Sequence, residues 1–348
     1  MMRYRIFGRR TGLRVSEIAL GGGMFGTAFG YGAAPDEVHR MLDAYAEAGG
    51  NFIDTADNYQ LGESETLIGE FVASRRDEFV IASKYSRGAS HQPALATLGN
   101  NRKAMVQSVE ESLKRLKTDR IDLYFVHMDD GVTPIDEVVR GLDDLVRAGK
   151  IVYGGLSNFP AWRIATAAST ADLRGLTPLA AIQVEYSLLQ RTTERELLPM
   201  AEAFGLGVMA WSPLGGGLLT GKYRTGAKGR ATDLKGSVLH DHPERNAPLL
   251  DTLTAIARDL DSTPSRIAIA WVRAKGVLPV IGPRTREQLD DNLAALAVTL
   301  NDEHLRRLDH VSDTPPGYPH ELLAAAEQRS IMSGGRGDSV DRPRETVR

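Results

Sequence analysis

Four side chains with acid–base chemistry stand where short apolar runs of the sequence end. Asp54 lies near the end of the second of these runs and Tyr59 follows that run, Lys84 lies at the end of the third, and His127 closes the fourth. A tyrosine hydroxyl is a weak acid near neutral pH, and a nearby lysine ammonium helps it to release a proton by favouring the phenolate. Asp54 can supply the counter-charge that a buried lysine needs. With a neutral histidine to orient a carbonyl oxygen, such a group could protonate an alkoxide as it forms, which requires a hydride source.

The runs themselves predict strands. Eight of them are rich in Val, Ile, Phe and Tyr, and most are apolar at nearly every position, as in parallel strands buried on both faces. Strand starts recur roughly every 30 residues for most of the chain, which is the length of one strand–helix unit. The predicted strands are 18–22, 50–56, 79–85, 121–127, 151–158, 180–186, 207–214 and 277–283.

Helical patterns lie between these strands. The first is bounded by Pro35 near its start and Gly49 after its end, as expected for helix boundaries. After the fourth strand we expect a helix with Thr133 as N-cap and Asp136 completing a capping box. Further helices are predicted over 64–74, 106–116, 160–170, 193–204, 264–275 and 285–296.

Strict alternation of strands and helices implies right-handed parallel crossovers, and eight repeats imply closure into a barrel. We therefore predict an α/β fold, a (β/α)8 TIM barrel in a single domain; an open doubly wound sheet is the alternative. The gap 215–276 must hold an insertion, whose stretch 224–245 is predicted to be a mobile loop. We expect the barrel to span residues 1–320, and residues 321–348 to form a C-terminal helix and a polar, flexible tail.

Composition excludes several classes of protein. The 348 residues include 42 Lys and Arg against 45 Asp and Glu, a net charge of −3, which does not suit a nucleic-acid binder. Zero cysteines exclude thiolate catalysis, disulfides and Cys-ligated metals. His240-Asp241-His242 shows no third ligand, so we expect no metal site. Without a run of about 18 apolar residues or a signal-peptide core, we expect no membrane partner and a cytoplasmic location.

One motif match is rejected. The segment 21–26 fits the glycine pattern of a dinucleotide-binding turn, G-x-G-x-x-G. That turn works only where a helix begins at the last glycines and faces the pyrophosphate. Here the next helix is predicted to begin near Pro35, so a Rossmann fold is not supported.

The active site of such a barrel lies at the carboxyl ends of its strands, and the residues found there resemble the aldo-keto reductase superfamily, in its bacterial and potassium-channel β-subunit-like branch. The likeness runs from about Gly8 to Pro319. It rests on 52–59 with 62–65, Lys84, His127, 155–159, 183–187, 211–214, 219–223, and 281–285 with Gln288, Asp291 and Asn292.

The resemblance implies NADPH-dependent reduction of an aldehyde or ketone to an alcohol. The substrate, a small-molecule partner, could be a keto-sugar or another metabolite carbonyl. Tyr59 would donate the proton with help from Lys84 and Asp54, and His127 would orient the carbonyl. An N-terminal β-hairpin and a loop and helix insertion between strands seven and eight are also implied. The cofactor NADP(H) would contact Gly22, Gly23, Asp54, Ser157, Asn158, Gln183, Trp211, Ser212, Leu214, Gly216, Lys222, Gly282, Arg284, Thr285, Gln288 and Asn292.

Within that set, Ser157, Asn158 and Gln183 would bind the nicotinamide carboxamide, and Trp211 would stack on the ring. Arg284 would bind a phosphate and favours NADP(H) over NAD(H). The helix that follows it is expected to offer free N–H groups to the same phosphate.

Two other functions stay open. A regulatory subunit could bind NADP(H) as a redox signal with only vestigial turnover, as channel-associated relatives suggest. A barrel aldolase could use Lys84 as a Schiff-base lysine, but Trp211 would then have no role. The carbonyl substrate and the reaction direction are not fixed by the sequence, and a homo-oligomer is compatible with it.

Overall fold

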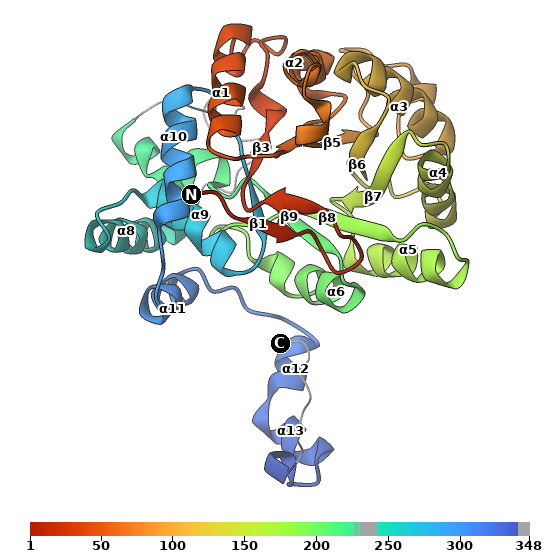
Figure 1. The fold of residues 1–348 in the computed structure, drawn as a ribbon. Helices are drawn as coiled ribbons and strands as arrows, with labels where there is room; N and C mark the ends of the chain where they lie inside the picture. The colour runs from red at the N-terminus through yellow and green to blue at the C-terminus, as the bar shows by residue number, and fades with distance from the viewer. Residues whose placement is uncertain (227–228, 230–241, 340–348) are drawn as a thin grey trace.

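A computed structural model describes residues 1–226, 229 and 242–339. Eight parallel strands form a closed barrel in which the last strand pairs with the first, Val280 beside Ala19 (Figure 1). The strands are β3 (Ala19–Gly21), β4 (Phe52–Asp54), β5 (Val80–Tyr85), β6 (Ile121–Val126), β7 (Ile151–Ser157), β8 (Leu179–Glu185), β9 (Gly207–Trp211) and β10 (Leu278–Ile281). Each overlaps one predicted strand, so the predicted TIM barrel is confirmed.

Helices surround the barrel (Figure 1). Those between successive strands or next to them are α1 (Pro35–Glu47), α2 (Glu63–Val72), α3 (Arg102–Leu116), α4 (Ile135–Arg147), α5 (Ala161–Leu173), α6 (Leu197–Phe204), α9 (Pro264–Ala274) and α10 (Arg286–Ala294). The insertion after β9 contains α8 (Pro243–Asp259), and the chain after α10 adds α11 (Asp302–Val311), α12 (His320–Ala324) and α13 (Ala326–Met332). Most of the predicted mobile loop 224–245 lies outside the described residues, as does 340–348 at the end of the predicted tail.

The N-terminal hairpin closes one end of the barrel. Its strands β1 (Tyr4–Ile6) and β2 (Arg14–Ser16) are antiparallel. Between them, Phe7 is buried with its ring edge-on to Phe52, the two centroids 5.5 Å apart. Phe52 is the first residue of β4, and Phe7 clusters with other side chains from strand beginnings. The hairpin therefore covers the amino ends of the strands and leaves their carboxyl ends for the site.

The predicted capping box before α4 is wrong. The helix begins after Pro134 and has no side-chain cap. The Thr133 hydroxyl instead donates to Asp130 Oδ2 at 2.6 Å, and Asp130 Oδ1 also accepts the backbone N–H of Thr133 at 2.8 Å. Since Asp130 holds both the N–H and the hydroxyl of Thr133 in a turn that precedes the helix, Thr133 is not available as an N-cap.

The glycine-rich segment 21–26 behaves as predicted. Only a single 3₁₀ turn, Gly22–Met24, forms there, and α1 begins at Pro35. No α-helix starts at these glycines, so the dinucleotide-binding turn is absent from this part of the chain.

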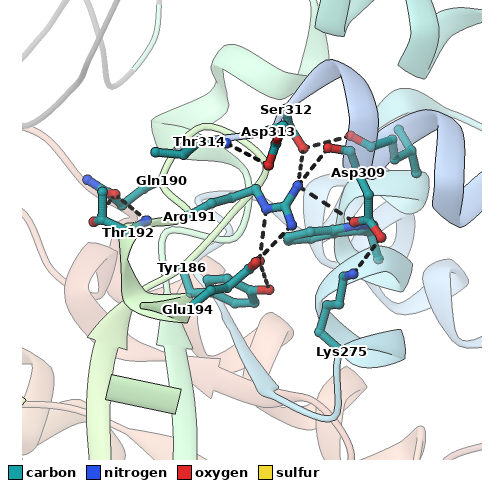
Figure 2. A network of polar contacts seen from close by, with 12 residues as sticks. Tyr186, Gln190, Arg191, Thr192, Glu194, Lys275, Asp309, Ser312, Asp313 and Thr314 are labelled. Carbon is teal, nitrogen blue, oxygen red and sulfur yellow. Dashed lines mark hydrogen bonds and ion pairs between the residues drawn. The ribbon is translucent and has the colours of Figure 1, made fainter. Parts of the chain in front are cut away.

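A polar network around the buried Arg191 fixes α11 to the barrel (Figure 2). Arg191, in the loop after β8, binds both carboxylate oxygens of Glu194 at 2.8 Å and the Asp309 carbonyl at 2.8 Å. Asp309 lies on α11 and accepts from Trp271 Nε1 of α9 at 2.9 Å. This network joins one barrel loop to two helices that are far apart in sequence.

None of the helices in the described part of the chain has the length and apolar character needed to span a bilayer.

Candidate active site

A cavity of about 990 Å³ opens at the carboxyl ends of the strands. Tyr59, His127 and Trp211 line one part of it. Gly282 and Arg284, which follow β10, line another part. This volume is at the upper end of the range for small-molecule sites, so the cavity has room for a cofactor and a substrate together.

Lys84 is the centre of the predicted tetrad, which consists of Asp54, Tyr59, Lys84 and His127. Its ammonium donates to Asp54 Oδ2 at 2.7 Å, to the Thr55 carbonyl at 2.7 Å and to the Tyr59 hydroxyl at 3.3 Å. An ammonium has three N–H donors, and each has one acceptor here. The second Asp54 oxygen accepts from Gln183 Nε2 at 2.8 Å. The structure thus brings together the three predicted residues Asp54, Tyr59 and Lys84.

The charge on Lys84 is maintained by its neighbours. Both Lys84 and Asp54 are almost completely buried, with 0% and 2% of their surface exposed. Burial would lower the pKa of Lys84, but the attraction of Asp54 and the contact with Tyr59 outweigh burial and raise that pKa above its usual value. Lys84 is therefore an ammonium at neutral pH, directed at the tyrosine oxygen.

His127 completes the set. Its ring is edge-on to the Tyr59 ring at 5.7 Å between centroids. Burial, with the positive charges of Lys84 and Arg87, lowers the pKa of His127 well below its ordinary value, so the ring is neutral. Its Nδ1 has no hydrogen-bond partner among the described residues. A neutral imidazole keeps one N–H, which His127 can donate to a carbonyl oxygen.

The turn after β4 presents Tyr59 at the barrel rim. The N–H of Asp57 donates to the Lys84 carbonyl at 3.0 Å, which continues the pairing of β4 with β5. Directly after Tyr59, Gln60 and Leu61 take left-handed backbone conformations, with φ of 47° and 56°. Non-glycine residues rarely adopt such angles, and these unusual conformations occur often near functional sites. The chain thus reverses at Tyr59 and leads into α2.

Gln60 also positions a loop that contributes Phe29 and Tyr31 to the lining of the cavity. Its Nε2 donates to the Tyr31 carbonyl at 3.0 Å, and its Oε1 accepts from the Phe29 N–H at 2.9 Å. The neighbouring Glu63 accepts from the N–H of Thr27 at 2.8 Å. These bonds hold loop 27–31 beside Tyr59. Phe29 and Tyr31 are not among the site residues predicted from the sequence. The only available signal was their position, in a loop that follows a strand end.

Asn158 organises the opposite wall. It has a left-handed φ of 56°. Its Oδ1 accepts from Trp211 Nε1 at 3.0 Å, while its Nδ2 donates to the His127 carbonyl at 2.9 Å and to Ser157 Oγ at 3.0 Å. One amide therefore sets the orientation of Trp211 relative to the tetrad.

Most predicted cofactor-binding residues line the cavity, with three exceptions that contact neighbouring groups instead. Gly22 packs against α2, where a Cβ would lie 2.6 Å from Ser64 Oγ. Ser157 is buried beneath Asn158, and Thr285 caps α10. Those that line the cavity are Gly23, Asp54, Asn158, Gln183, Trp211, Ser212, Leu214, Gly216, Lys222, Gly282, Arg284, Gln288 and Asn292.

The expectation of free N–H groups at the start of α10 needs correction. The Arg286 N–H donates to Glu37 Oε1 at 2.6 Å, and the Gln288 N–H donates to Thr285 Oγ1 at 3.3 Å. Because these donors already have acceptors inside the protein, the side chains of Arg284 and Gln288 are the groups that face the cavity there.

No group of three or more His, Asp or Glu side chains in the described ranges is arranged to hold a metal ion. His240 and Asp241 of the His-Asp-His segment lie outside those ranges.

A closed (β/α)8 barrel with an Asp–Tyr–Lys–His set at its strand ends is the architecture of an acid–base barrel enzyme. A family model described as the aldo/keto reductase family matches residues 17–313. The chain belongs to this family.

Similar proteins with stated names are oxidoreductases. A norsolorinic acid reductase of Aspergillus flavus is 36% identical over 95% of this chain and 86% of its own length. An aryl-alcohol dehydrogenase of Pestalotiopsis microspora is 35% identical over 92% and 85%, and an uncharacterized oxidoreductase of Bacillus subtilis is 37% identical over 93% and 100%. Family and relatives together identify the chain as an oxidoreductase.

Proposed function

We propose that the protein reduces an aromatic aldehyde or ketone to the alcohol with NADPH, and that Tyr59 donates the proton. The observation that carries this proposal is the buried Lys84 ammonium, which Asp54 neutralises and which reaches the Tyr59 oxygen at 3.3 Å. The name of one relative, an aryl-alcohol dehydrogenase, supports an aromatic substrate. The rings of Phe29 and Tyr31 in the cavity wall support it too.

The tetrad residues have distinct tasks in this reaction. His127 donates its N–H to the carbonyl oxygen and so fixes the carbonyl beside Tyr59. When bound, the reduced nicotinamide supplies the hydride to the carbonyl carbon. Tyr59 transfers its proton to the oxygen that gains negative charge, and Lys84 stabilises the phenolate that remains. Asp54 keeps the lysine charged in a buried position.

The side chains that line the cavity offer groups suited to binding NADP(H). Trp211, held by Asn158, offers a flat ring for the nicotinamide. Both Nδ2 hydrogens of Asn158 are already donated, so its Oδ1 is the group that can accept from the carboxamide. Lys222 and Arg284 would hold phosphates on the other wall. Arginine binds a phosphate with two parallel hydrogen bonds, which supports NADPH over NADH.

The test replaces the proposed proton donor. We expect Tyr59→Phe to lower kcat by ~10²–10⁴, the usual contribution of general acid catalysis. The variant should bind NADPH as the wild type does, measured by cofactor fluorescence. Tyr31→Phe, which removes another cavity hydroxyl, is the matched control and should retain turnover. Near-wild-type reduction of benzaldehyde by Tyr59→Phe would contradict the mechanism, and a comparison with NADH tests the cofactor preference.

The complete tetrad supports an enzyme rather than a regulatory subunit. Steady-state NADPH oxidation with a panel of aldehydes separates the two, because a redox sensor would turn over very slowly. We further propose a cytoplasmic location and a small-molecule carbonyl as the partner. Self-association is open to measurement by analytical ultracentrifugation.

A further inference from the structure

Arg87 is a cation in the part of the cavity that contains the tetrad. It lines the cavity together with Tyr59, His127 and Met128. Its charge is near enough to His127 to lower the pKa of that ring, after burial and Lys84. The mechanism proposed above gives Arg87 no task.

The backbone holds Arg87 at this place. Ser86, just after β5, has a φ of 130°, and Gly88 has a φ of 72°. Ser86 is not glycine, so its conformation costs free energy that the surrounding contacts must offset. The Ser86 hydroxyl donates to the Tyr85 carbonyl and accepts the N–H of His127 at 3.2 Å. A sharp, bonded turn thus ties Arg87 to the same strand ends as Lys84 and His127.

No carboxylate near the tetrad neutralises Arg87. Within the described residues it has no ion pair or hydrogen bond, and two carboxylates close to the site, Asp54 and Asp129, have other partners. Asp54 is bound by Lys84 at 2.7 Å, and Asp129 is bound by Arg163 at 3.2 Å. An exposed guanidinium in a ligand cavity, without an internal counter-ion, can accept the charge of a ligand.

The cofactor phosphates are expected elsewhere. Arg87 follows β5, and Lys222 follows β9, which is opposite β5 in the strand order of the closed barrel. Besides the polar Asn58, the cavity lining contributed by the loops that carry Tyr59 and Arg87 and by their neighbours includes four aromatic or apolar side chains, Met24, Phe29, Tyr31 and Met128. This wall suits an aromatic ring that carries one anionic group.

We infer that the substrate is an aromatic carbonyl compound with a carboxylate substituent, which Arg87 binds. This inference rests on the proposed function and names the substrate class of the same site. Guanidinium and carboxylate form two parallel hydrogen bonds, which fix orientation as well as supply affinity. The ring lies along Phe29, Tyr31 and Met128, so that the carbonyl group points at Tyr59 and His127.

The experiment compares two probes of nearly equal shape. The kcat/KM for 3- and 4-carboxybenzaldehyde is divided by that for the corresponding formylbenzamides, in wild type, Arg87→Gln and Arg87→Lys. For the better ring isomer we expect this ratio to be roughly 10–100 in the wild type, as for a hydrogen bond to a charged group. It should fall close to one in Arg87→Gln and be partly restored in Arg87→Lys. Arg140→Gln, which removes an exposed arginine of α4 that does not line the cavity, should keep the wild-type ratio.

A binding measurement separates this inference from the proposed reaction. Calorimetry with 3- and 4-(hydroxymethyl)benzoate and their amides, in the presence of NADP⁺, reports the same preference without turnover. Tighter binding of the better benzoate by wild type, lost in Arg87→Gln, supports the inference even if no aldehyde is reduced. Equal binding of acid and amide by the wild type, or a preference that survives in Arg87→Gln, overturns it. Failure of the proposed reaction appears separately, as absence of NADPH oxidation with every carbonyl compound.

Discussion

Lys84 and Asp54 show that the free-energy cost of a buried charge depends on whether its partner is present. Replacing Lys84 by Met leaves the Asp54 carboxylate buried without its ammonium. Removing one partner of a buried pair usually costs 3–5 kcal/mol, so we expect Lys84→Met to lower the free energy of unfolding by about that amount. The double variant Lys84→Met/Asp54→Asn should recover part of this loss because no lone charge stays buried.

The measurement is urea unfolding, followed by steady-state NADPH oxidation on the same samples. Activity should stay lost in the double variant, since Tyr59 still lacks the ammonium. Recovery of turnover together with stability would mean that Lys84 serves folding alone.

Asp57 gives a prediction for the dependence of stability on pH. It is 2% exposed, and its Oδ1 has no hydrogen-bond partner in the described ranges. Burial and the negative charge of Glu65 raise the pKa of Asp57 from 3.8 to about 7, although Arg115 opposes this. Between about pH 4 and pH 7 the folded state therefore holds a proton that the unfolded state has lost. Stability contributed by this group falls as the pH rises through that window and stays low above it.

The variant Asp57→Asn removes that titration. Its stability relative to wild type should increase from pH 4 to pH 7 and level off above pH 7, measured by chemical unfolding at each pH. A difference that is constant with pH would contradict the raised pKa. Asp77→Asn is a suitable control, because that aspartate is exposed, with 90% side-chain accessibility.

The tetrad could be predicted from the sequence, whereas the cavity-lining residues Phe29 and Arg87 could not. Asp54, Lys84 and His127 end strands, and a barrel brings strand ends together whatever the loops do. Phe29 and Arg87 lie in loops whose course depends on single interactions, such as the bonds from Gln60 and the turn at Ser86. No periodicity marks those interactions.

At the scale of elements, loop 27–31 depends on one side chain of the next strand–helix connection. Gln60→Met keeps the size of the side chain but removes both bonds to the loop, at Phe29 and Tyr31. We expect the KM for aromatic aldehydes to rise several-fold with a smaller change in kcat, because the tetrad keeps its own contacts. Amide hydrogens of residues 27–31 should exchange faster.

Gln107→Met, on the exposed face of α3, is the matched control and should change neither quantity. Unchanged exchange in loop 27–31 of Gln60→Met would show that Glu63 alone holds the loop.

Strands were easier to predict than helix ends for a physical reason. A strand buried on both faces must be apolar at nearly every position, so β5 and β6 stand out in the sequence. A helix end is decided by competition among nearby polar groups, and Asp130 takes the hydroxyl that would otherwise cap α4. The bounds of α8 and the presence of α11 were not predicted, because the insertion and the C-terminal part fall outside the strand–helix repeat.

At the scale of the whole molecule, α11 belongs to the barrel body and α13 does not. Leu308 on α11 is completely buried, and Asp309 on the same helix joins the Arg191 network (Figure 2). By contrast α12 and α13 contain no buried residue and extend away from the barrel (Figure 1). The two parts of the C-terminal region should therefore contribute very differently to stability.

Truncation tests this difference. A chain that ends at Ala325 loses α13 but keeps the contact of His320 with Glu196 on the segment before α6. We expect its Tm to stay within about 2 °C of the full chain, which corresponds to about 1.5 kcal/mol or less for a protein of this size, and its kcat/KM to be unchanged. A chain that ends at Leu300 removes Leu308 and Asp309, leaving Trp271 Nε1 and Arg191 Nη1 without their acceptors, and should unfold at a much lower temperature. Calorimetry of the three chains decides the matter: a large loss of Tm on removing α13 alone would mean that this helix packs against the barrel in solution.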